Sequence, residues 1–231
     1  MIFLIGGGDI GRANTNYNIK EIDQEIVKST NKIEPNFLFI GLADSYADSY
    51  YNIIKKNYQN LGCQTAYLKK KNIINNKELA KEKINAADII YIGGGDTIKL
   101  TKIVKEYKID ELLLKAYQKG TILVGFSAGA ILLAKGGYSD ALILRKESNE
   151  YTYLKGLNFV NININPHHND DPNKTKSLKK YLKSSNKEFY GLENQTALKI
   201  ENDDISIIKS NKDKNVFYLS YKERLISKKI N

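Results

Sequence analysis

The chain has 231 residues, which is enough to bury a sizeable core, and we expect residues 1–231 to form a single domain. Its net charge of +10 comes from lysines that stand singly or in short groups without an RNA-binding aromatic motif, so we expect no nucleic-acid partner. One cysteine excludes an intrachain disulfide framework, and no apolar run has the length of a signal peptide or a membrane span, so we expect a cytoplasmic protein.

The first half of the chain alternates short buried strands with amphipathic helices. Apolar runs predict strands at residues 2–5, 37–42, 64–68 and 89–92, and helical spacing predicts helices at 19–27, 47–61 and 76–86. This order predicts an α/β fold with three layers, in which a doubly wound, mostly parallel sheet carries helices on both faces.

A glycine-rich segment follows the first strand. Residues 6–11 read Gly-Gly-Gly-Asp-Ile-Gly and satisfy the Gly-x-Gly-x-x-Gly pattern of dinucleotide sites. However, no acidic residue closes a second strand at the usual interval, and no helix begins directly after the glycines. We therefore interpret the segment as a backbone turn near the carboxyl edge of the sheet.

A second glycine-rich segment, Gly93-Gly94-Gly95-Asp96-Thr97, follows the fourth strand and precedes a predicted helix. Backbone N–H groups of Gly94 or Gly95 are free to face outward there and to bind an anion. The alternative is a tight turn in which Thr97 caps the helix. A further helix is predicted at residues 109–119.

The most informative stretch is residues 121–134, an apolar strand that leads through Gly125-Phe126-Ser127-Ala128-Gly129 into a short helix. Gly-x-Ser-x-Gly is the pattern of a nucleophile elbow, in which a strained turn presents the serine hydroxyl above the sheet. The Ala128 N–H, at the positive end of the helix, would face a developing oxyanion. The alternative is a buried turn whose serine caps the helix.

The two histidines of the chain follow a predicted strand at residues 160–164. A serine hydroxyl needs a base, and histidine is the usual one at neutral pH. Neighbouring side chains on extended backbone point in opposite directions, so only one of the pair can face Ser127. We choose His167, which follows Pro166, and keep His168 as a candidate substrate contact. Adjacent histidines rarely share one ion, so we expect no metal.

The rest of the chain is less informative. Residues 138–144 are predicted to be extended and carry Asp140. A helix is predicted at residues 174–183 and a strand at 189–192, and three short antiparallel strands at 196–200, 205–208 and 216–219 are expected to cover one sheet edge.

Taken together, Gly-Gly-Gly-Asp-Thr, Gly-Phe-Ser-Ala-Gly-Ala and Asn-Pro-His occur in an order that resembles peptidase family S51. These serine peptidases include aspartyl dipeptidase (dipeptidase E) and cyanophycinase. The resemblance covers most of the chain, from the first strand to about Leu198. It implies a fold like that of class I glutamine amidotransferases with a small antiparallel C-terminal addition, and a Ser-His-acid triad without metal or cofactor.

Carried over by position, the resemblance makes Ser127 the nucleophile, His167 the general base, and the amides of Gly94 or Gly95 and of Ala128 the oxyanion hole. Asp140 is the first choice for the acid that orients the imidazole, and Glu193 is the second because other members use glutamate. Candidate substrate contacts are Asp96, His168 and Lys176.

Two departures from the dipeptidase pattern concern specificity. The loop after His167 looks shorter, and lysine stands where that enzyme has an arginine, whose planar fork grips a carboxylate in a way that lysine does not reproduce. Asp170 and Asp171 would also repel an acidic substrate. Strict cleavage after aspartate is therefore not expected.

These features predict a cytoplasmic serine hydrolase of the dipeptidase type that acts on a short peptide or a related small amide. One alternative is an esterase or amidase with the same triad, and another is a non-catalytic small-molecule-binding protein of the same fold. The expected partner is the small substrate, with a homodimer as a further candidate and neither nucleic acid nor membrane.

Overall fold

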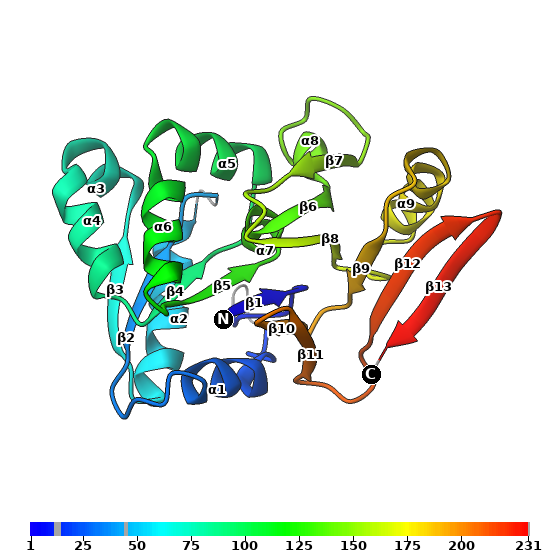
Figure 1. Ribbon diagram of the computed structural model, residues 1–231. Coiled ribbons are helices and arrows are strands. Elements are labelled where there is room, and N and C mark those ends of the chain that lie inside the picture. Colours follow the sequence, from blue (N-terminus) through cyan, green and yellow to red (C-terminus); the bar gives the residue numbers. More distant parts are fainter. Residues whose placement is uncertain (12–14, 44–45, 231) are drawn as a thin grey trace.

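The computed structural model describes residues 1–11, 15–43 and 46–230, which form helices packed on two β-sheets (Figure 1). The larger sheet has seven strands in the order β11-β10-β1-β5-β4-β2-β3. Neighbouring strands from β1 to β3 are parallel, and β10 and β11 extend the β1 edge in antiparallel fashion. The strands are β1 (Ile2–Ile5), β2 (Asn36–Ile40), β3 (Gln64–Leu68), β4 (Ile89–Ile92), β5 (Ile122–Phe126), β10 (Thr196–Glu201) and β11 (Asp204–Lys209).

The second sheet has six strands in the order β13-β12-β9-β8-β6-β7, with β8 parallel to both β6 and β9. Helix α9 (Pro172–Ser185) covers it through Leu178 and Leu182, which pack with Tyr138, Phe189 and Leu219. The strands are β6 (Ala134–Ser139), β7 (Thr152–Lys155), β8 (Val160–Pro166), β9 (Phe189–Leu192), β12 (Val216–Lys222) and β13 (Arg224–Ile230).

Buried strands that are apolar on both sides produce the layered arrangement of the larger sheet. In β1, Ile2 and Leu4 join one core cluster, whereas Phe3 and Ile5 join the other. The first cluster includes α4 (Lys77–Ala86), α5 (Thr97–Glu106), α6 (Ile109–Gln118) and α7 (Ala128–Leu133), and the second includes α1 (Lys20–Lys28) and α2 (Ala47–Asn60). This arrangement confirms the predicted doubly wound α/β class.

Several elements differ from the sequence-based expectations. Residues 138–144 are not extended throughout: β6 ends at Ser139, and Ala141–Leu144 forms the short helix α8. Short apolar runs do not distinguish strand from helix, which explains this error. Strand β12 belongs to the second sheet and not to the edge of the first. Helix α3 (Lys70–Asn75) and strands β7 and β13 were not predicted.

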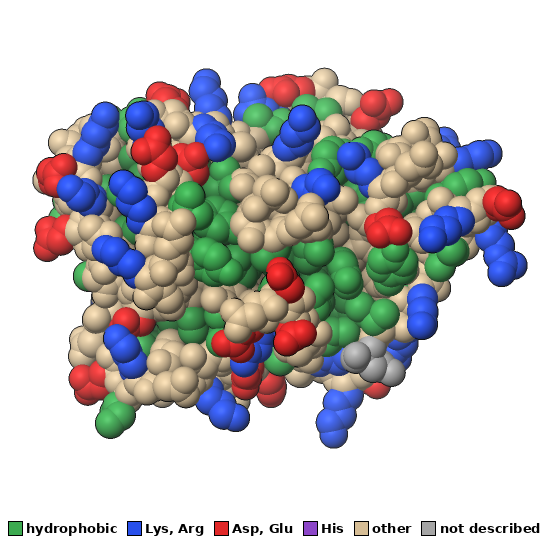
Figure 2. All heavy atoms as spheres, in the orientation of Figure 1, with side chains coloured by type: hydrophobic (Ala, Val, Ile, Leu, Met, Phe, Trp, Pro, Cys, Tyr) green, Lys and Arg blue, Asp and Glu red, His purple; other side chains and the backbone are tan. Residues whose placement is uncertain are grey.

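The surface and the helices give two further observations. On the face shown in Figure 2, Lys and Arg side chains are interspersed with acidic and uncharged ones. Within the described ranges, no helix combines the length and the apolar composition that crossing a bilayer requires.

A buried carboxylate joins α1 to α2 beneath the larger sheet. The Asp23 side chain is 1% exposed and accepts hydrogen bonds from the hydroxyls of Tyr17 and Tyr58. Burial raises the pKa of Asp23 to about 7, although both hydrogen bonds act in the opposite direction. The folded protein therefore holds this proton more tightly than the unfolded chain does.

We expect this group to make stability fall as the pH rises. Its contribution is fully present below about pH 4, where an unfolded aspartate is protonated, and is lost as the pH rises to about 7. Relative to Asp23→Asn, which cannot ionise, the wild type should lose about 4 kcal/mol of unfolding free energy between pH 4 and pH 8. Urea unfolding of both proteins at several pH values measures this difference. Parallel curves would show that Asp23 does not titrate in this range.

Candidate active site

Ser127 lies at a sharp turn between the carboxyl end of β5 and helix α7, which Figure 1 shows in the middle of the molecule. Its φ of 52° and ψ of −107° form a strained conformation for a residue with a side chain. A Cβ atom at Gly125 would lie 2.4 Å from the Gly129 carbonyl oxygen, and one at Gly129 would lie 2.2 Å from that of Ile92. The backbones approach as closely as the elbow interpretation expects, so only glycine fits on either side of Ser127.

His167 faces the serine hydroxyl from the end of β8. The distance from Ser127 Oγ to His167 Nε2 is 2.8 Å, which is a hydrogen bond. His167 has a positive φ of 54°, and its N–H donates to the carbonyl of Gly6 at 2.9 Å. Of the two histidines, the one chosen from the sequence is therefore the one that contacts Ser127.

The other ring nitrogen of His167 contacts an amide and not an acid. His167 Nδ1 lies 2.7 Å from Asn194 Oδ1, in the loop that follows β9. This corrects the expectation that Asp140 or Glu193 occupies this place. Glu193 points elsewhere: its carboxylate accepts hydrogen bonds from the Asn169 side chain at 2.9 Å and from the Asn215 N–H at 2.8 Å.

Asp140 also makes no hydrogen bond to His167 in the described structure. It occupies the residue before α8, and its charge acts on His167 only through space. Asn194 directly follows Glu193, so the sequence-based second choice lies next to the residue that contacts the ring. The family resemblance implied a carboxylate for this role, with Asp140 first and Glu193 second.

The glycine turn after β1 holds the three site segments together. Successive carbonyl groups accept backbone N–H groups from the elbow, from the histidine loop and from the asparagine loop. Ile5 O accepts from Ser127 N, Gly6 O from His167 N, and Gly7 O from Gln195 N, each at 2.9 Å. These contacts confirm the interpretation of residues 6–11 as a backbone turn at the carboxyl edge of the sheet.

The second glycine segment borders the serine. A Cβ atom at Gly94 would lie 3.4 Å from the Cβ atom of Ser127, so this backbone passes directly beside the nucleophile. Gly95 has a φ of +127°, and a Cβ atom there would lie 2.7 Å from the Ala43 carbonyl oxygen. Ala128 is the first residue of α7. A side chain at position 94 would therefore press against Phe126 and Ser127.

The three candidate substrate contacts have different surroundings. His168 is 4% exposed, its Nδ1 lies 2.9 Å from Asn165 Nδ2, and its ring packs against Phe217, so little of it could touch a substrate. Asp96 caps α5 by accepting from the Lys99 N–H and pairs with Arg145 at 3.2 Å. Lys176 lies on α9 and is exposed.

Burial and a nearby lysine lower the pKa of His167. Desolvation is the larger cause, and the positive charge of Lys174 acts in the same direction. The Asn194 hydrogen bond and the charges of Asp140 and Asp170 oppose both. The imidazole is therefore neutral at pH 7 and able to accept a proton at Nε2.

Sequence reasoning missed Lys174. This residue is 6% exposed, and its Nζ donates to the Pro166 carbonyl at 2.7 Å, one residue before His167. Burial lowers the pKa of Lys174 to about 8, against the opposing charges of Asp140, Asp171 and Asp170. Lysine is usually a surface residue, and no local pattern distinguishes Lys174 from the other lysines of α9.

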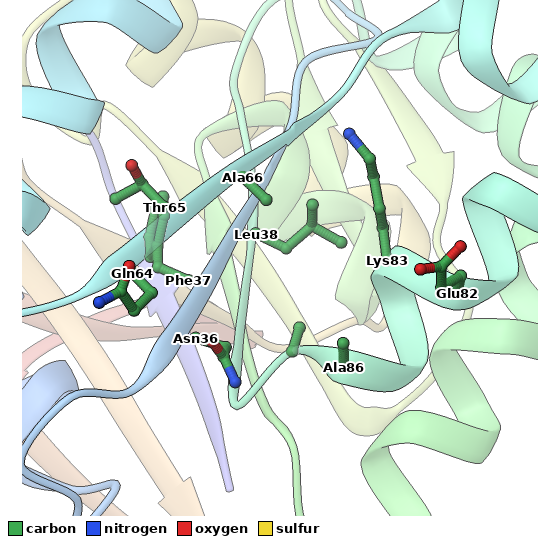
Figure 3. Close-up of a pocket in the computed structure, with 10 residues that line it drawn as sticks. Asn36, Phe37, Leu38, Gln64, Thr65, Ala66, Glu82, Lys83 and Ala86 are labelled. Atoms are coloured by element: carbon green, nitrogen blue, oxygen red, sulfur yellow. The ribbon is translucent and has the colours of Figure 1, made fainter.

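The cavity shown in Figure 3 lies at the opposite end of the strands from the serine. The cavity in Figure 3 is lined by the amino ends of β2 and β3 and by α4, whereas Ser127 follows the carboxyl end of β5. Within the described residues, no group of three or more His, Cys, Asp and Glu side chains could hold a metal ion.

The chain is similar to known proteins in both sequence and fold. The model of the family described as Peptidase family S51 matches residues 2–208. The uncharacterized peptidase YgaJ of Bacillus subtilis is 27% identical over 173 residues, which cover 74% of this chain and 69% of that protein. Peptidase E of Nostoc sp. is 27% identical over 222 residues, which cover 90% and 85% of the two chains.

Two solved structures share the fold. A peptidase from an acI-B1 Actinobacterium superposes with a TM-score of 0.74 at 21% identity, covering all of this chain and 93% of the other. A putative peptidase E protein from Listeria monocytogenes gives a TM-score of 0.68 at 21% identity, covering 90% and 97%.

Proposed function

Since this chain belongs to peptidase family S51 and is accordingly a peptidase, we propose that it is a serine peptidase that cleaves short peptides or related small amides through Ser127 and His167. The observation that supports this proposal most directly is the 2.8 Å contact between Ser127 Oγ and His167 Nε2. A hydroxyl on a strained elbow beside a neutral imidazole is the arrangement that activates a serine.

The proposed reaction proceeds through an acyl-enzyme. As Ser127 Oγ attacks the carbonyl carbon, His167 Nε2 takes the hydroxyl proton, and the amides of Gly94 or Gly95 and of Ala128 stabilise the oxyanion. The imidazolium then gives its proton to the leaving amine as the C–N bond breaks. Water, deprotonated by His167, attacks the ester, and the carboxylic acid leaves with Ser127 restored.

The proposal of a small substrate follows the resemblance to dipeptidase E and the membership of peptidase family S51. The Asp96 carboxylate accepts a hydrogen bond from the first turn of α5 and pairs with Arg145. We therefore propose that Asp96 positions the Gly93-Gly94-Gly95 turn and does not bind the substrate. Lys176 remains a candidate contact for the substrate's acidic end, because it is exposed on α9.

A small fluorophosphonate tests for an activated serine. We expect one phosphonate to be added per wild-type chain and to be located on Ser127 by peptide mapping, because the reagent reacts only with serines that have a base. Ser184→Ala, which removes an exposed serine of α9, is the matched control and should label fully. A folded wild-type protein that stays unlabelled, or that is labelled elsewhere, would contradict the proposal. A panel of short peptides and esters then identifies the bond that is cleaved.

A further inference from the structure

The atom that faces His167 Nδ1 belongs to a side chain that cannot ionise. Asn194 Oδ1 lies 2.7 Å from Nδ1, and Ser127 Oγ lies 2.8 Å from Nε2 on the opposite side of the ring. An amide oxygen only accepts, so this contact requires the imidazole proton to be on Nδ1. Nε2 then has a free lone pair for the serine proton. The opposite amide orientation would put the proton on Nε2 and leave Ser127 without an acceptor.

Asn194 is held in this place by the backbone around it. A Cβ atom on Gly7 would lie 2.2 Å from Asn194 Oδ1 and 2.4 Å from His167 Nδ1, so the glycine lies directly against the contact between the two side chains. The next residue, Gln195, donates its N–H to the Gly7 carbonyl at 2.9 Å. The loop backbone is therefore tied to the turn after β1, and the Asn194 side chain packs against Gly7.

We propose that Asn194 is the positioning residue of the triad, and that this peptidase works with a neutral amide behind its histidine in place of a carboxylate. The inference rests on the proposed function and specifies how that function is carried out. The amide fixes the ring and its tautomer, as a carboxylate would. Unlike a carboxylate, it does not stabilise the imidazolium that forms during proton transfer.

The charges around His167 agree with this arrangement. The buried Lys174 ammonium, on α9, donates a hydrogen bond to the Pro166 carbonyl, one residue before His167. Asp140 and Asp170 act on the ring through space. Their charges raise the pKa of His167 by less than burial and Lys174 lower it. The site therefore favours a neutral base, and we expect the wild type to keep its activity at a lower pH than a Ser-His-acid site would.

Asn194→Asp is the most direct test because it changes charge and keeps shape. A carboxylate in hydrogen-bonding contact with a buried imidazole should raise the pKa of His167 by about 1 to 3 pH units. The acid limb of the kcat/KM profile should move upward by the same amount, since that limb reports the base of the free enzyme. Above this limb, kcat of the variant should equal or exceed that of the wild type.

Asn194→Ala separates positioning from simple packing. Without an acceptor at Nδ1 the ring loses its fixed tautomer, so kcat should fall at least about tenfold, and the acid limb should not move upward. Asn194→Asp should therefore keep the turnover of the wild type, whereas Asn194→Ala should not. If the alanine and aspartate variants both keep the wild-type kcat and acid limb, Asn194 has no role in the triad and the inference is overturned.

Nitrogen-15 NMR measures the tautomer and the pKa of His167 in the absence of substrate. The chain has only two histidines, so the His167 signals can be assigned by comparison with His167→Ala. The wild type should show the tautomer protonated at Nδ1, and Asn194→Asp should show the raised pKa. A wild-type ring protonated at Nε2 would overturn the inference even if Ser127 reacts with fluorophosphonate. Failure of labelling with the expected NMR result would instead contradict the proposed function.

Two control variants address the carboxylates expected from the sequence. Glu193→Gln should leave the acid limb unchanged, because that side chain bonds to Asn169 and Asn215 and not to the ring. Asp140→Asn should lower the acid limb only slightly, because Asp140 acts through space. A loss of turnover in Asp140→Asn that matches or exceeds the loss in Asn194→Ala would assign the orienting role to Asp140 and overturn the inference.

Discussion

Replacing Ser127 by alanine is expected to lower peptide turnover at least about 10⁴-fold, because no other group in the proposed mechanism can form the acyl-enzyme. The change removes one oxygen atom and its hydrogen bond to His167 Nε2. Alanine can take the same backbone conformation as serine, so the elbow should persist, and the free energy of unfolding should change by no more than about 1 kcal/mol. Kinetics with the best substrate of the peptide panel, together with urea unfolding, measure both quantities.

Two comparisons make this result specific. Ser184→Ala, on an exposed face of α9, should keep wild-type turnover and show that the loss is not a general effect of removing a serine. His167→Ala should lose nearly as much as Ser127→Ala, and the double variant should lose little more, because the two residues act as one unit. Residual turnover of about one tenth in Ser127→Ala would mean that a different group attacks the substrate.

The fold class could be predicted because each buried strand of a parallel sheet is a short, continuous apolar run in the sequence. Runs such as Ile2–Ile5 and Ile89–Ile92 are apolar on both faces, and helical spacing separates them. The second sheet was not anticipated, since its strands β6 and β7 contain glycine, lysine and tyrosine without clear alternation. Their strand conformation depends on pairing with segments far along the chain, which local propensity does not encode.

The site shows the same division between local and long-range information. Ser127 and His167 could be found because a glycine-flanked serine and an isolated histidine pair are rare local patterns with a chemical reason. The residue behind the histidine depends on how the loop after β9 meets the turn after β1. The Gln195 N–H to Gly7 contact sets that geometry, and it joins residues 188 positions apart. The family resemblance placed Glu193 second after Asp140 for this role, whereas the residue that contacts the ring is Asn194.

Gly7→Ala is expected to lower turnover at least about 100-fold by moving the base and its partner. The new methyl group would lie 2.3 Å from His167 Cε1 and 2.2 Å from Asn194 Oδ1, so both side chains would have to shift. Displacements of about 1 Å in a catalytic group are sufficient for losses of this size. The φ of +147° is also unfavourable for alanine and adds about 1 to 3 kcal/mol of destabilisation.

Gly120→Ala separates the backbone effect from the effect on the site. Gly120 also has a positive φ, at +95°, but a Cβ atom there would meet no described atom within 4 Å. This variant should lose a similar amount of stability and keep its kcat. If Gly7→Ala loses stability without losing turnover, the contact between the β1 turn and the His167–Asn194 pair does not control the chemistry. If it loses turnover, and fluorophosphonate labelling slows by a similar factor, the turn after β1 positions the base that activates Ser127.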